Sequence, residues 1–435
     1  MLTSQITFRA IAPIYSPLSL HLGVDQFSTH FTEEFKALYL QIFNSSDDDE
    51  KTAINWKGNL VNLSEQHGRR QYQSTDENSK DVRLMCWTPA NNDDGRCNVM
   101  FHVFTNNIAI VEIELAMDLN DLKTVNNSID DRVKAAEEKV QELAKAQIDL
   151  HYNDFRNDLQ QLSPYLSSDF ALSTTTDNND ITWVARTMLI NDEQLESDEF
   201  RSILTSWLKK TARPDDALKI INNKKQYSMT WLNYVVKNPQ AVGLDPHIHM
   251  MILAQYYYVS QENCNSALRG AIEVAYSQSR KEKMDAILAK TRINCRLNEI
   301  AYFENIKFLN RPNRALLEDI LSGWQFDQLV DNSERMIEIC NARLQEEDNK
   351  KRERSTTMTD FLLVTLSFFA IFELSLYLTE FSREMMSRPA LDYNDNKSSF
   401  FLGLIAEVDA DIMFSFGFGL TLLLIIVYRY IKRNE

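Results

Sequence analysis

The sequence predicts an α+β cytosolic domain followed by a helical hairpin, a long stalk helix and two transmembrane helices. Two long apolar runs lie within residues 361–431, a helical pattern free of Gly and Pro precedes them, and β-rich runs occur before residue 120. With 435 residues, the chain is too long for one ordinary domain. We expect its bulk to stay in the cytosol, because residues 1–15 contain no basic start followed by a continuous apolar stretch.

The N-terminal part, residues 1–240, is expected to form a mixed α/β sensor domain. In residues 108–119 aliphatic side chains alternate with Glu112 and Glu114, which predicts a strand with one solvent-exposed face. Asn106 and Asn107 precede this strand and predict a tight hairpin turn. The predicted strands cover residues 54–63, 82–90, 98–106, 108–119, 181–190 and 227–236.

Helical periodicity predicts three helices in this domain, at residues 31–43, 128–162 and 193–209. The helices alternate with the last two strands, so the domain is expected to end near residue 240. Residues 241–312 are expected to form a helical hairpin, with helices at 246–279 and 280–309 and a break at Asn310-Arg311-Pro312.

The stalk is assigned to residues 313–357 and is expected to continue unbroken into the first membrane span. No Gly or Pro occurs in residues 325–378, and apolar residues keep a helical spacing through this stretch. At about 1.5 Å per residue, such a helix is much longer than a bilayer crossing requires. We therefore expect a cytosolic stalk that transmits motion into the membrane.

The two membrane spans are assigned to residues 358–378 and 412–431. Residues 361–378 carry one charge, that of Glu373. Lys and Arg residues precede the first span and occur at the end of the second span. The positive-inside rule therefore places both chain termini, including the tail 432–435, in the cytoplasm. The loop 379–411 between the spans has seven acidic and three basic residues, which either follows from this topology or concentrates cations at a pore mouth.

An ionisable side chain within a membrane span is costly and usually faces a bundle interior or a water path. Glu373 recurs in a seven-residue series with Thr359, Leu366 and Glu380, so these residues share one helical face. The series predicts a pore-lining face. The alternative is a protonated Glu373 that hydrogen-bonds to a neighbouring helix.

Composition and motifs favour a protein that is neither an enzyme nor a nucleic-acid-binding protein. Lys and Arg total 46 against 62 Asp and Glu, a net charge of −16, which disfavours direct contact with nucleic acid. No P-loop, zinc-protease, hydrolase or dinucleotide motif occurs, so no cofactor is expected. The five cysteines are scattered and are expected to be reduced thiols. His247 and His249 point apart on a helix, so no metal site is expected.

The densest basic group of the sensor domain is either an ordinary surface patch or the docking site of a phosphate-bearing ligand. Its members are Lys209, Lys210, Arg213, Lys224 and Lys225.

The order of these elements resembles the CorA family of two-pass cation channels over most of the chain. The Gly-Met-Asn filter of that family is absent, and Tyr377-Leu378-Thr379-Glu380-Phe381 stands in its place. The resemblance implies a homopentamer in a bacterial inner membrane. By the same resemblance the first span lines the pore, with Thr365, Phe369, Glu373 and Glu380 along it.

Without that filter, the chain is most similar to the divergent CorA-like branch associated with type III CRISPR antiviral systems. This resemblance implies a membrane channel opened by a small nucleotide second messenger. Two other functions remain open from the sequence. One is a housekeeping magnesium or divalent-cation transporter, and the other is a non-conducting membrane receptor or scaffold.

Overall fold

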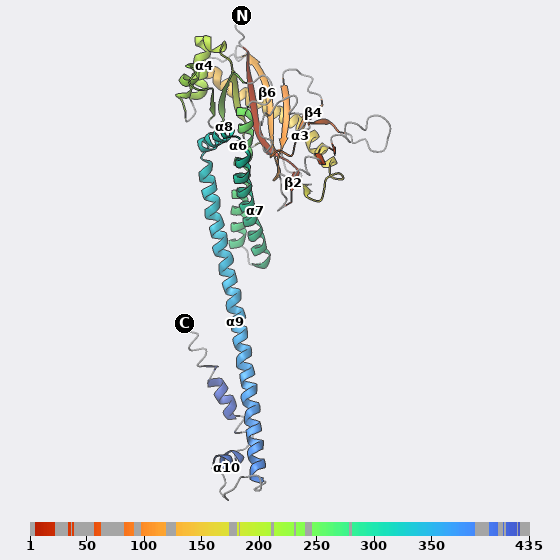
Figure 1. The fold of residues 1–435 in the computed structure, drawn as a ribbon, viewed down its shortest axis with the longest axis vertical. Helices are drawn as coiled ribbons and strands as arrows, with labels where there is room; N and C mark the ends of the chain where they lie inside the picture. The colour runs from red at the N-terminus through yellow and green to blue at the C-terminus, as the bar shows by residue number, and fades with distance from the viewer. Residues whose placement is uncertain are drawn as a thin grey trace, which may run out of the picture. The chain divides into compact units, whose positions relative to one another are not determined.

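The computed structural model (Figure 1) divides into two compact units, Met1–Cys340 and Asn341–Glu435, which are described separately. The predicted helix at residues 31–43 lies largely outside the described residues. The structure describes residues 5–21, 34–35, 37–38, 56–61, 82–90, 97–118, 128–173, 181, 183–209, 213–229, 232–239, 246–277, 281–387, 400–407, 412, 415–423 and 425–426.

The first unit is built on an eight-stranded sheet of order β3-β4-β5-β6-β1-β8-β10-β9. Neighbouring strands are antiparallel except β8 and β10, which are parallel. A separate pair, β2 and β7, forms a small second sheet. The strands are β1 (Gln5–Tyr15), β2 (Leu18–Leu20), β3 (Gly58–Val61), β4 (Met85–Pro89), β5 (Cys97–Val103), β6 (Ile108–Asp118), β7 (Phe170–Leu172), β8 (Ala185–Ile190), β9 (Tyr227–Met229) and β10 (Asn233–Lys237).

The strand at the centre of this sheet, β1, was not among the predicted strands. It pairs with β6 along its whole length, from Gln5 opposite Asp118 to Tyr15 opposite Ile108, and with β8 on its other side. Apolar residues of β1 are buried on both faces, as Phe8 and Ile11 illustrate. A strand buried on both sides has no polar alternation, so the usual period-2 signal is weak.

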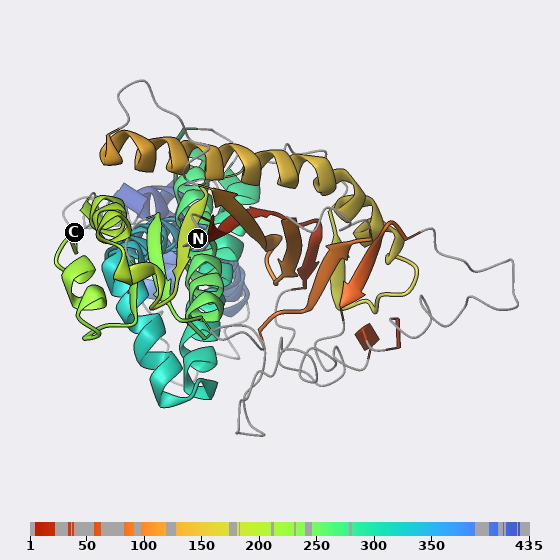
Figure 2. The same ribbon diagram turned by 90° about the horizontal axis from the view of Figure 1, so that it is seen from above.

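Helices cover both faces of the sheet (Figure 2). Helix α3 (Ile129–Gln161) packs on one face, where Phe155 and Val140 join a core with Phe8, Phe101 and Trp87. The opposite face packs against α6 (Pro246–Ser277) and α8 (Arg311–Gly323) in a second core. Burial on two sides gives the sheet residues of β1 and β6 little access to solvent.

Several predicted elements are confirmed with shifted limits. Ser128 caps α3 by accepting a hydrogen bond from Asp131 N at 3.1 Å, as expected for a helix beginning there. Asn106 and Asn107 adopt left-handed backbone angles, with φ of 62° and 61°, and form the predicted turn between β5 and β6. The predicted helix at 193–209 is a short 3₁₀ turn followed by α4 (Asp198–Lys209).

The predicted strand at 227–236 is instead two strands. β9 and β10 pair antiparallel, with Tyr234 opposite Met229. Leu232, with a φ of 72°, lies between them in the left-handed region. The pattern did not reveal this break, because no Gly or Pro marks the turn.

The predicted helical hairpin is confirmed as α6 and α7 (Lys281–Phe308). Tyr257 and Tyr302 place their ring centroids 4.9 Å apart across it, and Ser260 Oγ donates to Asn298 Oδ1 at 2.6 Å. The two helices therefore run antiparallel in close contact.

The predicted stalk, residues 313–357, is divided by a turn. Helix α8 ends at Gly323, and α9 (Phe326–Ser387) begins after Gln325, whose φ is 57°. Trp324 and Phe326 are buried on either side of that turn, at 6% and 4% exposure. From Phe326 onward the helix is unbroken through residue 378, as predicted, and continues nine residues further to Ser387.

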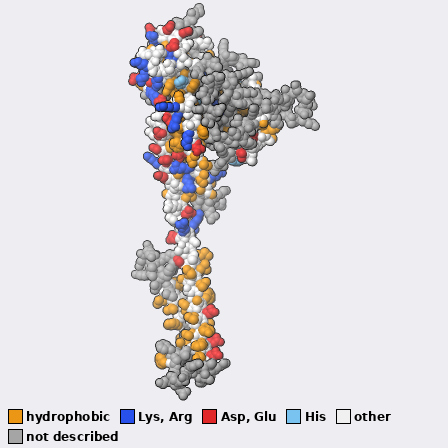
Figure 3. All heavy atoms as spheres, in the orientation of Figure 1, with side chains coloured by type: hydrophobic (Ala, Val, Ile, Leu, Met, Phe, Trp, Pro, Cys, Tyr) orange, Lys and Arg blue, Asp and Glu red, His pale blue; other side chains and the backbone are white. Residues whose placement is uncertain are grey.

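The second unit contains the rest of α9, the short helix α10 (Phe400–Glu407) and a helical stretch at residues 415–423. Among the described residues, one helix, Phe326–Met385, is long and apolar enough to cross a membrane, and its apolar window is not buried by the chain. Hydrophobic side chains gather over this unit in Figure 3. The predicted second span, residues 412–431, lies partly outside the described residues.

One carboxylate joins α3 to the edge of the sheet. Asp158 is fully buried and accepts hydrogen bonds from Lys57 N at 3.0 Å, Gly58 N at 2.9 Å and Trp87 Nε1 at 3.0 Å. Burial raises the pKa of Asp158, although these donors favour its ionised form. The Asp158 carboxylate therefore fixes the position of both the start of β3, through Gly58, and the Trp87 ring.

We predict that Asp158→Ala lowers the free energy of unfolding by about 3 kcal/mol, because two buried N–H groups, those of Gly58 and Trp87, and the partly buried N–H of Lys57 lose their acceptor. Asp154→Ala on the same helix is the matched control, since its bond to Lys57 is solvent-exposed. Denaturant unfolding of the detergent-solubilised protein, followed by tryptophan fluorescence, measures both. Equal losses from the two variants would contradict the assignment.

Candidate functional site

The apolar part of α9 presents a face that the described residues leave uncovered. Thr359, Leu366, Glu373 and Glu380 are all exposed. At 3.6 residues per turn, they lie on the side of the helix opposite Phe368, Ser375 and the buried pair Thr379 and Ser382. That opposite side faces the helical stretch 415–423.

The contact between these two helices is aromatic and apolar. The Phe368 and Phe418 rings meet edge to face with centroids 6.3 Å apart. A groove of about 250 Å³ lies beside this contact. Its lining residues are Asp360, Leu363, Val364, Ser367, Phe368, Ile371 and Thr421. The second helix therefore packs away from the glutamates.

The four predicted pore residues are not equivalent in the structure. Glu373 and Glu380 are exposed on one stripe, and Phe369, 62% exposed, lies beside it. Thr365 is half-buried toward the packed side, and its hydroxyl donates to Phe361 O at 2.8 Å. In the described part of the chain, Glu373 makes no hydrogen bond or ion pair, so the interhelical bond considered for it is not found among those residues.

The predicted basic group is largely engaged in intramolecular pairs. Arg213 donates two hydrogen bonds of 3.0 Å to the Asp319 carboxylate of α8. These hydrogen bonds raise the pKa of Arg213, and burial lowers it by a smaller amount. Lys209 pairs with Asp130 at 3.2 Å.

Lys225 lies in a second part of this group. Its Nζ is 2.7 Å from Asp216 and 5.3 Å from the Tyr227 ring centroid. Burial acts to raise the pKa of Asp216. The hydrogen bonds from Lys225 and Ser228 together have a larger opposite effect, so the net pKa is lowered. Lys224 is exposed, and Lys210 lies outside the described residues. The structure thus brings Arg213 and Lys225 near one another around Asp216 and Tyr227, and it pairs Lys209 with a separate carboxylate.

His247 and His249, the two histidines considered as metal ligands, lie in the first turn of α6. His247 packs against Tyr227 with ring centroids 4.8 Å apart. Within the part of the chain that the structure describes, no group of three or more His, Cys, Asp or Glu residues could hold a metal ion.

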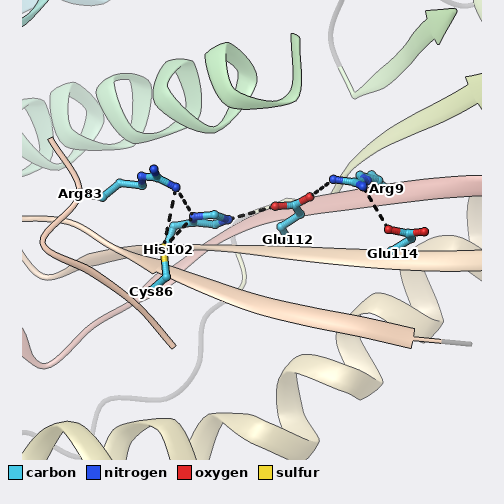
Figure 4. Close-up of polar contacts among 6 residues, drawn as sticks. All are labelled: Arg9, Arg83, Cys86, His102, Glu112 and Glu114. Atoms are coloured by element: carbon cyan, nitrogen blue, oxygen red, sulfur yellow. Dashed lines mark hydrogen bonds and ion pairs between the residues drawn. The ribbon is translucent and has the colours of Figure 1, made fainter. Parts of the chain in front are cut away.

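A row of side chains runs from the residues just before β4 across β4, β5, β6 and β1 (Figure 4), and we call it the buried relay: the buried residues Arg83, Cys86, His102 and Glu112, and the partly buried Arg9. His102 Nδ1 is 3.1 Å from Arg83 Nη1 and 3.4 Å from Cys86 Sγ. His102 Nε2 is 3.1 Å from Glu112 Oε2, and Glu112 also pairs with Arg9.

The relay corrects the prediction that Glu112 lies on a solvent-exposed face. Glu112 is 5% exposed, because Arg9 of β1 and His102 of β5 flank it and because this face of the sheet packs on α6. Glu114, two residues on, keeps the predicted exposure and contacts Arg9 at 3.1 Å. Arg9 in an otherwise apolar run and His102 within a strand were the signals that could have revealed the relay.

The protonation of His102 follows from its neighbours. A guanidinium can only donate, so Nδ1 accepts from Arg83 and Nε2 carries the proton shared with Glu112 in the neutral ring. Burial lowers the pKa of His102, whereas Cys86 and Glu112 raise it, and the net direction is upward.

The order thiol, imidazole, carboxylate is that of an activated nucleophile and its base. Cys86 and His102 are both 0% exposed, however, so a substrate cannot reach Sγ in this conformation. The burial of the row favours a structural role, in which it holds four strands in register.

No protein-family model matches this chain, and no curated protein or solved structure matches it.

We predict that Glu112→Gln lowers the free energy of unfolding by about 1–3 kcal/mol, because His102 and Arg9 lose a buried charged acceptor, while Arg9 keeps its contact with Glu114. Glu114→Gln, at a side chain 41% exposed, should change stability by about 0.5 kcal/mol or less. Thermal unfolding of both variants in detergent compares them. A Glu114→Gln loss as large as that of Glu112→Gln would refute the distinction.

The bidentate pair between Arg213 and Asp319 should behave as a structural contact between the sheet domain and α8. A double-mutant cycle with Arg213→Ala and Asp319→Ala is expected to give a coupling of about 0.5–1 kcal/mol, reduced by its partial exposure. A coupling energy of zero, measured by denaturant unfolding, would contradict this structural role and would leave ligand binding as the role of Arg213.

Proposed function

We propose that this chain is the subunit of a homo-oligomeric, CorA-like two-pass membrane channel gated by a small cytosolic ligand. The proposed ligand is a nucleotide second messenger, and the proposed role is membrane disruption in antiviral defence. In this scheme the first span lines the pore and the sheet domain senses the ligand.

The observation that carries the proposal is the uncovered stripe of α9. Glu373 lies within an apolar stretch, where a carboxylate needs water or a polar partner. The chain's own second helix packs on the other side, against Phe368, and leaves the stripe open. A ring of copies with this stripe turned inward would give Glu373 and Glu380 an aqueous axis and would turn apolar residues toward lipid.

A second apolar face supports assembly in the cytosolic unit. Ile293, Leu297, Ile300 and Phe303 follow one another at helical spacing along α7 and are 44%, 37%, 52% and 53% exposed. Contiguous exposed apolar side chains on a soluble helix are typical of an interface. Self-association would cover them. The pentameric number rests on the family resemblance alone.

Gating requires that the ligand bind the open state more tightly, by about 5.5 kcal/mol in total to move a pore from 1% to 99% open. The link between the sheet domain and α8 through Arg213 and Asp319 supports a mechanical route, because α8 leads directly into α9. Exposed Lys224, close to Lys225 in sequence, is the basic residue most open to a phosphate.

The decisive experiment measures ion flux from liposomes that contain the purified full chain. We expect flux that depends on an added nucleotide messenger, with cyclic mononucleotides and cyclic oligonucleotides as the probes. Glu373→Gln should reduce cation flux at least about tenfold, since it removes the charge from the proposed axis. Glu353→Gln, on the cytosolic part of the same helix, is the matched control and should conduct as the wild type does.

Each other result has a definite meaning. Flux without any messenger that magnesium suppresses would identify a divalent-cation transporter instead. Absence of flux from correctly assembled protein would favour a receptor or scaffold. Unchanged flux in Glu373→Gln would remove this glutamate from the pore.

A further inference from the structure

Three cysteines that are far apart in sequence come together where three helices meet. Cys264 lies on α6, Cys295 on α7 and Cys340 on α9, and all three are free thiols. Cys295 Sγ is 3.6 Å from the backbone carbonyl oxygen of Cys264, and the two thiols hydrogen-bond to each other. From the sequence alone, the five scattered cysteines were expected to be reduced thiols.

The pairing of Cys264 with Cys295 follows from the register of the helical hairpin. Tyr257 faces Tyr302, and Ser260 hydrogen-bonds Asn298. Each step of three or four residues along α6 is matched by a similar step back along α7. The next contact in this series is Cys264 with Cys295, so the two thiols are held together by the contacts that hold the helices.

The two thiols differ in access and in acidity. Cys264 is partly exposed, whereas Cys295 is 2% exposed and Cys340 is fully buried. The hydrogen bond from Cys295 lowers the pKa of Cys264. The same bond, together with burial, raises the pKa of Cys295. A partly exposed thiol with a lowered pKa in contact with a buried thiol is the arrangement of a reactive and a resolving cysteine.

We propose that Cys264 is a site of reversible thiol–disulfide exchange and that Cys295 resolves it into a disulfide across the α6–α7 hairpin. The oxidant class is a low-molecular-weight disulfide such as glutathione disulfide. The Cys264 thiolate attacks one sulfur of that disulfide, forms a mixed disulfide and expels one thiolate. Cys295 then loses its proton and attacks Cys264 Sγ, which forms the intramolecular bond and expels the second thiolate. Two protein thiols are oxidised and one external disulfide is reduced to two thiols.

Cys340 serves as the internal comparison. It lies on a third helix, and burial raises its pKa. An external disulfide cannot reach this fully buried thiol, and the register of the hairpin places Cys295 against Cys264, so Cys340 should stay reduced when the other two react. The inference concerns the α6–α7 hairpin alone and does not depend on channel function.

The test uses the purified full chain in detergent, equilibrated with glutathione disulfide and then alkylated under denaturing conditions. Intact mass and peptide mapping should show a Cys264–Cys295 disulfide in the wild type, reversed by dithiothreitol. Cys295→Ser should stop at one glutathione attached to Cys264, and Cys264→Ser should leave Cys295 unmodified. Cys340→Ser should behave as the wild type does.

Three results would overturn the proposal. The first is a wild-type protein in which Cys264 and Cys295 both remain alkylatable at a concentration of glutathione disulfide that converts the exposed cysteine of a model peptide into its mixed disulfide. The second is a disulfide that joins either cysteine to Cys340. The third is a Cys295→Ser protein that gains no glutathione at Cys264, since that variant keeps the accessible thiol. The wild-type mapping requires no substitution, so it stands even where a variant is unstable.

Discussion

An apolar helix surface that its own chain does not cover must be covered by lipid or by other chains, and this constraint governs the second unit. Leu363, Leu366 and Leu374 of α9 are 60%, 70% and 67% exposed. At roughly 25 cal/mol per Å² of apolar surface, leaving such side chains in water is strongly unfavourable. A bilayer would remove that cost for leucine but not for Glu373, so insertion of this helix would require lipid on one side and a polar environment on another. Because Phe368 packs on Phe418, the second helix covers the side of α9 that carries Phe368 and leaves the side that carries Glu373 exposed.

The first unit solves a different problem, the burial of charge within a sheet. The β1 and β6 strands lie at its centre, and both carry ionisable residues there, Arg9 and Glu112. The two charges neutralise one another, and His102 connects the pair to Arg83 and Cys86. Polar groups that are satisfied only by one arrangement of strands specify the register more strictly than apolar packing does. The relay thus contributes to the uniqueness of the sheet as well as to its stability.

Local patterns predicted the parts of this fold that local chemistry determines. Ser128 marked the start of α3, and Asn106 with Asn107 marked the β5–β6 turn, because capping and left-handed turns depend on the residues at the site itself. The helical hairpin and the unbroken α9 followed in the same way from periodicity and the lack of Gly and Pro.

The parts that were missed depend on contacts between distant residues. Arg9 and Glu112 are 103 positions apart, so neither residue alone signals that the other neutralises it. The central place of β1 depends on two partner strands for the same reason. In the candidate site, heptad spacing correctly placed Glu373 and Glu380 on one face, but only the structure showed that Arg213 and Lys209 already have acidic partners. Residue spacing shows which face of a helix a side chain occupies, but it does not show which residues of other elements contact that face.

The turn between α8 and α9 depends on Gln325, a residue with a side chain in a left-handed conformation that glycine would adopt freely. Holding a non-glycine residue there costs roughly 1–2 kcal/mol, which the burial of Trp324 and Phe326 on either side offsets. Trp324 also packs on Tyr258 of α6 and Tyr234 of β10, with ring centroids 5.8 Å and 6.4 Å away. These ring contacts therefore hold the turn in this conformation. A change in the direction of α9 relative to α8 would require the contacts of Trp324 with Tyr258 and Tyr234 to be broken.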